Sequence, residues 1–150
     1  MTFVDPLGTD IYIALYEAVG GTNHIGIGVN SANTVGFYSN PPFPISIPIP
    51  FLAPGEVVVD RLHHPEGPIA VIRISRTQEQ DKAVMDLILS RFLNPGKYNL
   101  ASRNCSNFVQ DALKVAGVDS GAQLAGVPND LFDNLSRRFP LTPGPRFPGR

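Results

Sequence analysis

The stretch Asn104-Cys105-Ser106-Asn107-Phe108-Val109 holds the single cysteine of this 150-residue chain and opens a segment with helical periodicity. Apolar residues recur from it at the spacing of a buried helix face: Phe108, Val109, Ala112, Leu113 and Ala116. A thiol in the first turn of a helix lies beside free backbone N–H groups and the positive end of the helix dipole, and both favour the thiolate. The thiolate is the nucleophilic form of cysteine, so the stretch predicts a nucleophile at a helix N-terminus.

Cys105 also fits a purely structural role. Cysteine is among the most buried residue types, and Cys105 shares the apolar face of its helix. Its polar neighbours Asn104, Ser106 and Asn107 instead favour a helix start that is hydrated or hydrogen-bonded. A nucleophile and a core cysteine therefore both remain open at this point.

A nucleophilic thiol needs a base, and three histidines are available. His24 begins a strand-like segment that contains Gly26 and Gly28, and small residues there would let the cysteine helix approach closely. His63 and His64 precede a proline in an expected turn, where we expect solvated side chains. His24 is therefore the candidate base.

The acidic residues offer no obvious third member of a site. Asp10, Glu56, Asp60 and Glu66 are scattered over expected strand ends and turns, and we expect most of them to be solvated. The chain has no C-x-x-C or H-E-x-x-H metal motif, and Gly26 and Gly28 form G-x-G without a third glycine. We therefore expect neither a metal nor a dinucleotide cofactor.

The order of secondary-structure patterns predicts an α+β domain, with an antiparallel sheet packed against helices. Strand patterns come first, at Ile11–Glu17, His24–Asn30, Thr34–Ser39, Val57–Leu62 and Ala70–Ser75. Helix patterns follow, after a capping box at Thr77–Gln80 through about Phe92, from Cys105 to Gly117, and from Asn129 to Arg138. Two proline-rich stretches, Pro41–Pro54 and Pro140–Pro148, are predicted to be extended loops.

Composition narrows the functional classes. A formal charge of −1 without a basic cluster beyond Arg137-Arg138 gives no electrostatic case for nucleic acid. No apolar run has the roughly 18 residues of a membrane-spanning helix. The N-terminus lacks the basic and apolar regions of a signal peptide.

His24-Ile25-Gly26-Ile27, followed much later by Tyr98-x-Leu100-x-x-x-Asn104-Cys105-x-x-Phe108, resembles the circularly permuted papain-like (NlpC-type) superfamily. Its members include lecithin–retinol acyltransferase-like enzymes and PPPDE isopeptidases. The match runs from about His24 to Val115. Ordinary NlpC peptidases place the cysteine before the histidine, whereas here the histidine comes first, as in the permuted branch.

The resemblance implies a thiol hydrolase or acyltransferase with Cys105 as nucleophile and His24 as general base. The Cys105 backbone N–H, with support from Asn104, would bind the oxyanion. The family's third polar residue usually lies on the strand after the histidine, where this chain has neither a histidine nor an acid. Tyr38, Ser39 or a backbone carbonyl could then orient His24, or the site is a bare dyad.

Asp5-Pro6-Leu7-Gly8 resembles the junction at which Rhs-repeat proteins pass into variable C-terminal toxin domains, although a plain turn is the alternative. With Gly36-Phe37-Tyr38, it suggests an antibacterial toxin domain that a secreted carrier delivers to the periplasm or inner-membrane face of a target cell. This implies a junction at residues 1–10, a catalytic domain at 11–139 and a proline-rich tail at 140–150. It also implies an Rhs-type carrier and a cognate immunity protein as partners.

The sequence leaves the substrate open. An uncharged apolar loop includes Phe43, Ile45, Ile47 and Phe51, and such a loop could contact acyl chains or a membrane surface. The loop could instead pack along the sheet as a cover, which its composition favours over lipid contact. A phospholipid ester is favoured slightly over a peptidoglycan amide or an isopeptide bond, and a non-enzymatic binding module remains a further alternative.

Overall fold

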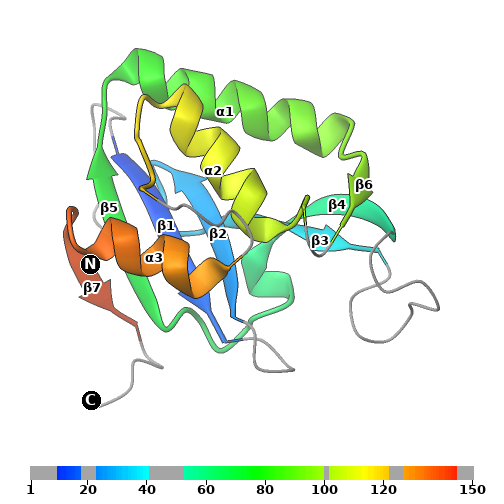
Figure 1. Cartoon of the computed structure of the whole chain (residues 1–150), viewed down its shortest axis with the longest axis horizontal. Helices are drawn as coiled ribbons and strands as arrows, with labels where there is room; N and C mark the ends of the chain where they lie inside the picture. The colour runs from blue at the N-terminus through cyan, green and yellow to red at the C-terminus, as the bar shows by residue number, and fades with distance from the viewer. Residues whose placement is uncertain (1–9, 18–22, 41–52, 100–101, 122–126, 145–150) are drawn as a thin grey trace.

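The computed structural model describes residues 10–17, 23–40, 53–99, 102–121 and 127–144, which form an α+β structure (Figure 1). Seven antiparallel strands in these residues form one sheet with the order β6-β4-β3-β2-β1-β5-β7. The strands are β1 (Asp10–Tyr16), β2 (His24–Val29), β3 (Val35–Ser39), β4 (Ala53–Val59), β5 (Ala70–Ser75), β6 (Lys97–Tyr98) and β7 (Leu141–Pro143). The helices are α1 (Gln78–Leu93), α2 (Cys105–Val115), α3 (Pro128–Ser136) and the short 3₁₀ helix η1 (Asp60–Leu62).

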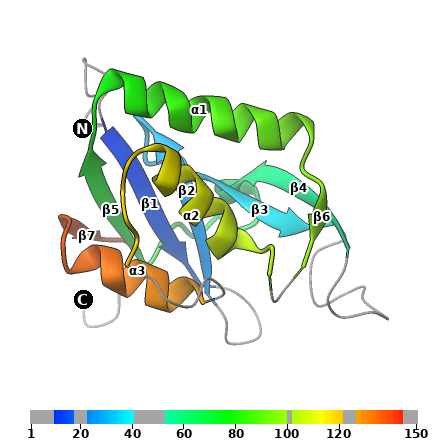
Figure 2. The same cartoon turned by 45° about the horizontal axis from the view of Figure 1, so that its top comes forward.

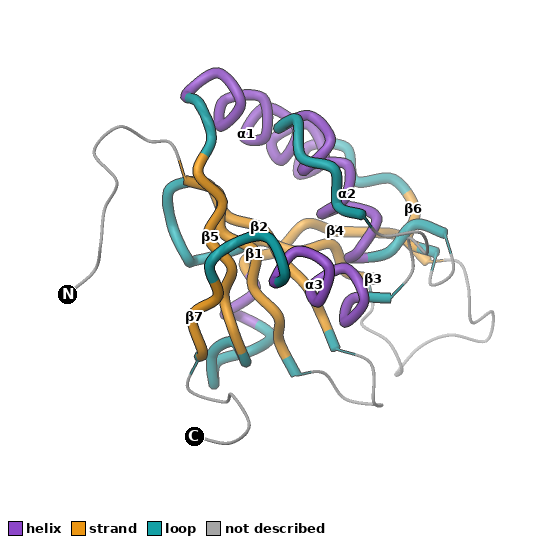
Figure 3. Tube along the Cα trace, turned by 60° about the vertical axis from the view of Figure 1, so that its left-hand side comes forward, coloured by secondary structure: helices purple, strands orange, loops and turns teal. Residues whose placement is uncertain are grey.

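The main core lies between one face of the sheet and the three α-helices. Side chains alternate between the two faces along each strand. Ile11, Ile13 and Leu15 of β1 therefore point to the same side as Ile25 and Ile27 of β2, and all five belong to the hydrophobic cluster. Buried residues of all three α-helices join this cluster, among them Val84, Phe108, Val109, Leu113, Leu131 and Leu135. Figures 1 and 3 show the helices over this side of the strands.

Two helix starts follow directly from their capping sequences. Thr77 accepts a hydrogen bond from the N–H of Gln80, whose side chain bonds back to the N–H of Thr77, so the predicted capping box is confirmed. Asn104 and Asn107 form the same reciprocal arrangement at the start of α2. Cys105 is therefore the first residue of a firmly capped helix, as the sequence predicts.

The predicted α+β class is confirmed, but the strand expected at Val57–Leu62 runs from Ala53 to Val59 instead. The segment expected as a strand at Val57–Leu62 leaves the sheet after Val59, and Asp60–Leu62 turns into η1. The carbonyl of Asp60 accepts hydrogen bonds from the N–H groups of His63 and His64, which closes the turn. This turn carries Asp60 out of the strand and directs it to the opposite face of the sheet from the helices.

The proline-rich stretches are not loops throughout. Leu141–Pro143 pairs with β5 as the edge strand β7, and Ala53 and Pro54 belong to β4. Proline lacks a ladder donor but is tolerated at the edges and ends of a sheet. The folded domain thus includes Asp10 and residues 141–143 from the expected flanking segments, and residues 41–52 lie outside the described part.

β2 and β3 pair at Ile27 and Val35 and diverge toward the start of β2 (Figure 2). The strands β3, β4 and β6 extend away from β1, β2 and β5 on the far side of this divergence. His24 is the first residue of β2. The candidate site is therefore located where the two parts of the sheet separate.

Candidate functional site: a buried cysteine, histidine and aspartate

The structure brings Cys105 and His24 together, although 81 positions separate them (105 − 24). The Cys105 thiol lies near enough to the His24 imidazole and to the backbone N–H of Ile25 for both groups to lower its pKa. Cys105 is 7% exposed and His24 6%, so the two groups meet in a largely dry environment. This placement contradicts the alternative of a cysteine buried in the core away from histidine.

The environment favours the charged forms of both groups. Burial alone would raise the pKa of the Cys105 thiol, but the nearby His24 charge, the hydrogen bonds from His24 and Ile25, and the Ser106 hydroxyl lower it. Burial would likewise lower the pKa of His24, yet the Cys105 thiolate and the Asp60 carboxylate raise it to about 10. Both shifts favour a thiolate paired with an imidazolium over the neutral pair.

Asp60 is the third member of the cluster, and the sequence analysis did not identify it. His24 Nε2 lies 2.8 Å from Asp60 Oδ1, and Asp60 is fully buried. The expectation that most of the acidic residues are solvated was wrong for Asp60, and also for Asp10, which is 4% exposed. Because Asp60 occupies Nε2, Nδ1 is the ring nitrogen that remains for a second partner. This is the arrangement that a nucleophile, base and orienting group require.

Burial alone would raise the pKa of the Asp60 carboxyl. The positive His24 and hydrogen bonds from His24, Thr34 and Tyr38 reverse this and lower the pKa. Thr34 Oγ1 donates to Oδ2 at 2.5 Å, and the Tyr38 hydroxyl donates to Oδ1 at 2.6 Å. Asp60 therefore stays ionised although it is fully buried.

Glycines on the two neighbouring strands make room for this carboxylate. A Cβ atom at Gly26 would collide with Asp60 Oδ2 and Thr34 Oγ1, and one at Gly36 with His24 Nε2 and Asp60 Oδ1. A Cβ at Gly28 would instead meet the backbone carbonyl of Ser31. The expectation that Gly26 and Gly28 admit the cysteine helix was therefore wrong.

We expect Gly36→Ala to separate His24 from Asp60. The added methyl group has no space between the two side chains, and overpacking of this kind costs about 1–3 kcal/mol of stability. Urea denaturation should report that loss, and the pH profile of Cys105 alkylation should shift toward that of an ordinary thiol. A variant with an unchanged alkylation profile would contradict the tight packing around the pair.

The other predicted site residues fall at different places. Tyr38 stacks on His24 with ring centroids 4.4 Å apart, besides its hydrogen bond to Asp60. Ser39 points to the opposite face of β3 from Tyr38, because side chains alternate along a strand.

The side-chain oxygen of Asn104 accepts from the N–H groups of Ser106 and Asn107, so it caps the helix. The cap oxygen therefore accepts from these two N–H groups and not from that of Cys105. Phe43, Ile45, Ile47 and Phe51 lie outside the described residues.

His64 was expected to be solvated, and this was wrong. His64 is only 7% exposed. Its ring centroid lies 4.9 Å from that of Tyr16 and 5.3 Å from that of His24. Burial and the positive charge of His24 lower its pKa, so His64 is neutral beside the charged pair. The 3₁₀ turn that positions Asp60 also turns His64 inward, a consequence that the expected strand could not reveal.

Two further hydroxyl groups, those of Tyr98 and Ser106, interact electrostatically with Cys105. Tyr98 of β6 stacks on Phe37 with ring centroids 5.5 Å apart, and burial, followed by the charge of Cys105, raises its pKa. Its phenol is therefore protonated and able to donate. The Ser106 hydroxyl is fully buried and makes no hydrogen bond of standard geometry to any described group, yet it is near enough to help lower the pKa of Cys105.

We expect Cys105 to be alkylated at lower pH than an ordinary thiol. Its lowered pKa means that thiolate persists as the pH falls through the usual cysteine pKa of about 8.5. Since the chain has one cysteine, iodoacetamide labelling followed by intact mass reports on this residue alone. The shape of the rate–pH profile is the relevant quantity, because burial slows the absolute rate. The same protein unfolded in urea is the control, and coincident folded and unfolded profiles would contradict the ion pair.

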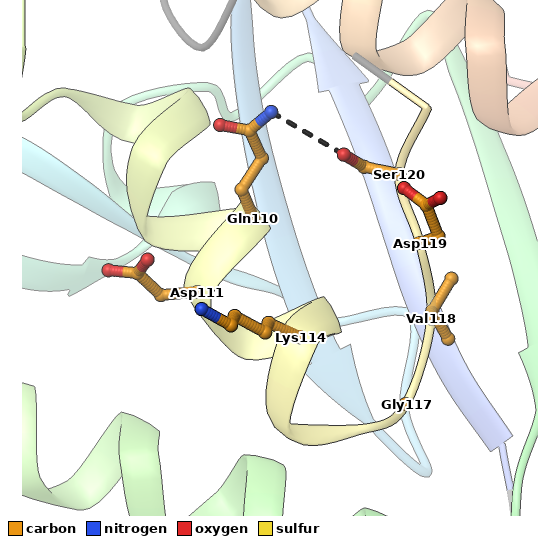
Figure 4. Close-up of a pocket in the computed structure, with 7 residues that line it drawn as sticks. All are labelled: Gln110, Asp111, Lys114, Gly117, Val118, Asp119 and Ser120. Atoms are coloured by element: carbon orange, nitrogen blue, oxygen red, sulfur yellow. Dashed lines mark hydrogen bonds between the residues drawn. The ribbon is translucent and has the colours of Figure 1, made fainter. Parts of the chain in front are cut away.

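A separate cavity of about 440 Å³ lies along the C-terminal half of α2 (Figure 4). It is lined by Gln110, Asp111, Lys114, Gly117, Val118, Asp119 and Ser120. Gln110 and Ser120 face each other across it at 3.5 Å, and Lys114 and Asp111 also come from α2. Since Cys105 begins α2, this cavity is not part of the Cys105 site.

Within the described ranges, no group of three or more histidine, cysteine or acidic side chains is arranged to hold a metal ion. Nor does any helix there have the length and apolar character needed to cross a bilayer. Comparison with protein-family models, curated proteins and solved structures finds no match to this chain. The family resemblance of the sequence therefore stays a prediction, and the case for function depends on the geometry of Cys105, His24 and Asp60.

Proposed function

We propose that this chain is a thiol hydrolase with Cys105 as nucleophile, His24 as general base and acid, and Asp60 as the residue that orients His24. The observation that carries the proposal is a buried His24 that lies near the Cys105 thiol and whose Nε2 is 2.8 Å from Asp60 Oδ1. A structural cysteine requires neither an imidazole in contact nor a buried carboxylate behind that imidazole. Activated cysteines use this combination to hold the thiolate and to protonate the leaving group.

In the proposed reaction, the Cys105 sulfur attacks an acyl carbon and forms a thioester as the bond to the leaving group breaks. His24, protonated in the resting pair, gives its proton to the leaving group. It then accepts a proton from the water that hydrolyses the thioester, and Cys105 is released as thiolate. The N–H of Cys105 and the protonated Tyr98 hydroxyl are the candidate donors for the oxyanion.

The arrangement agrees with the permuted papain-like interpretation on three points. The histidine precedes the cysteine, the cysteine begins a helix, and that helix packs on an antiparallel sheet. We propose membership of this superfamily on these grounds, with one departure. The orienting group follows β4 rather than lying on the strand directly after the histidine.

We favour a phospholipid ester as substrate. In addition to the apolar loop predicted from the sequence, α1 carries large apolar side chains on its exposed surface. Leu89 is 51% exposed, Phe92 60% and Leu93 80%. From Leu87 to Gln110 the chain contains no acidic residue, so this region does not repel an anionic membrane surface. These features support lipid contact more directly than binding of a peptidoglycan peptide.

The test compares substrates in parallel. Vesicles of anionic phospholipid, purified peptidoglycan sacculi and an isopeptide-linked ubiquitin substrate are each incubated with the protein, and the products are identified by mass. We expect fatty acid from the vesicles, with Cys105→Ala as the control that releases none. Release of muropeptides or ubiquitin instead would redirect the substrate assignment, and no Cys105-dependent product from any of them would contradict the hydrolase proposal.

We also propose, from the sequence junction alone, that the domain acts as an antibacterial toxin carried by an Rhs-type protein. Asp5-Pro6-Leu7-Gly8 lies outside the described residues, so the proposal depends on the sequence. Expression in the periplasm of a susceptible bacterium should arrest growth, and a protein encoded beside the toxin should bind it and relieve the arrest. Growth that is unaffected by the wild-type domain would count against the toxin role.

A further inference from the structure

Asp60 is held by more than its partner histidine. Its second oxygen, Oδ2, accepts a 2.5 Å hydrogen bond from Thr34 Oγ1, and its backbone N–H donates to the Thr34 carbonyl at 3.0 Å. Thr34 is fully buried and lies just before β3. The side chain and backbone of Thr34 therefore both fix the position of Asp60.

The bond from Tyr16 to Thr34 has a defined direction. The Tyr16 hydroxyl lies 2.8 Å from Thr34 Oγ1, and either group could in principle donate. Thr34 has one hydroxyl proton, which it gives to the ionised Asp60, since a carboxylate can only accept. Tyr16 must therefore be the donor, and burial, chiefly, raises its pKa to about 12, which keeps its proton in place.

We infer that Tyr16 and Thr34 are positioning residues of the thiol site, acting through Asp60 and His24 on the Cys105 sulfur. The donor chain runs from Tyr16 on β1 through Thr34 to Asp60 Oδ2, which leaves Oδ1 directed at His24. Successive hydrogen bonds in a dry site polarise one another, so the Tyr16 hydroxyl strengthens the Thr34 donor. The inference rests on the proposed function and adds to it the residues that hold the orienting carboxylate.

The space around the hydrogen bonds from Tyr16 through Thr34 to Asp60 is too small for a water molecule to take the place of either donor. Gly26 lies against both Asp60 and Thr34 so closely that a Cβ atom would overlap them, and Tyr16 is 1% exposed. The other titratable or charged groups here are His24 on β2, Tyr38 on β3, Arg61 of η1 and His64 after it. Of these, His24 and Tyr38 bond to Oδ1, so Thr34 is the side-chain donor to Oδ2 among the described residues.

The test uses a matched pair at Thr34. Thr34→Val keeps the shape but removes the donor, whereas Thr34→Ser keeps the donor and removes a methyl group. The readout is the pH profile of Cys105 alkylation by iodoacetamide, with melting temperature measured alongside. We expect Thr34→Val to slow alkylation about 10-fold at mildly acidic pH, which corresponds to a thiolate pKa higher by about one unit. Thr34→Ser should keep the wild-type profile even if it melts lower.

Tyr16→Phe should shift the profile in the same direction by a smaller factor. Tyr12→Phe is the control, because Tyr12 lies four residues earlier on the same face of β1, opposite Arg73 in the sheet register. The inference is overturned if Thr34→Val keeps the wild-type profile, if Thr34→Ser shifts as far as Thr34→Val, or if wild-type Cys105 titrates as an ordinary thiol. A shifted thiolate with the expected Thr34 pattern, but no hydrolysis of any substrate, would reject the hydrolase proposal alone.

Discussion

Cys105→Ala is expected to abolish hydrolysis while the protein remains folded. Loss of a nucleophile that forms the covalent intermediate typically costs on the order of 10⁴-fold or more in kcat, because the remaining groups cannot provide an equivalent route. The folded state should survive, since α2 keeps its Asn104 cap and the substitution removes one atom from the packed surface. The measurement is product release from the identified substrate, with circular dichroism and melting temperature on the same sample.

Cys105→Ser sharpens this test. A serine hydroxyl has nearly the same shape, but its pKa lies too far above that of a thiol for His24 to hold it as an anion. We therefore expect Cys105→Ser to be as inactive as Cys105→Ala. In both variants the pKa of His24 should fall below about 10, since one of the two anions that raise it is gone. Substantial activity in either variant would exclude Cys105 as the nucleophile.

The fold class and the two principal residues of the candidate site could be predicted because their signals are local. Capping sequences at Thr77 and Asn104 define helix starts from a few neighbouring residues. The alternation of isoleucine with small or polar residues in β1 and β2 likewise defines strands with a buried face. Cys105 is identified by its place in the first turn of α2, and His24 by the strand that it opens.

Asp60 and Thr34 could not be predicted in the same way, because their roles arise from contacts between distant strands. The run Val57-Val58-Val59-Asp60 has the pattern of a continuing strand, and nothing in it signals the turn at Asp60. The available signal was indirect. Gly26 and Gly36 lie on two adjacent strands, and both prove to leave space for one carboxylate. A pair of glycines facing an acid is informative only once the register is known.

Asp60→Asn is expected to weaken both the fold and the candidate site. Three donors converge on this carboxylate, from His24, Thr34 and Tyr38. An amide replaces one carboxylate oxygen with an N–H₂ donor, so at least one of the three donors loses its acceptor and must reorient or stay unpaired. Removing one partner of a buried ion pair costs about 3–5 kcal/mol of stability. Urea denaturation measures this loss, with Asp86→Asn on the exposed surface of α1 as the control that changes little.

The pH dependence of the stability loss in Asp60→Asn tests whether Asp60 acts through its charge. The folded-state pKa of Asp60 is lowered, so its contribution to stability is fully present above the unfolded value of about 4 and disappears as the pH falls through the folded value. The difference in unfolding free energy between wild type and Asp60→Asn should therefore be constant near neutral pH and shrink in acid. A difference that stays constant into strong acid would show that Asp60 acts through packing rather than charge.

Asp60→Asn should lower the hydrolytic activity by about 10²–10⁴-fold, because an orienting carboxylate holds the imidazole in its productive tautomer and stabilises its positive charge. The effect should not add to that of Cys105→Ala, since both residues act on the same imidazole. Without Asp60, His24 loses the anion on Nε2, its pKa falls, and the thiolate of Cys105 loses the cation that holds it. The rate–pH profile of Cys105 alkylation in Asp60→Asn should then be that of an ordinary thiol. A profile like that of wild type would show that His24 lowers the pKa of Cys105 without help from Asp60.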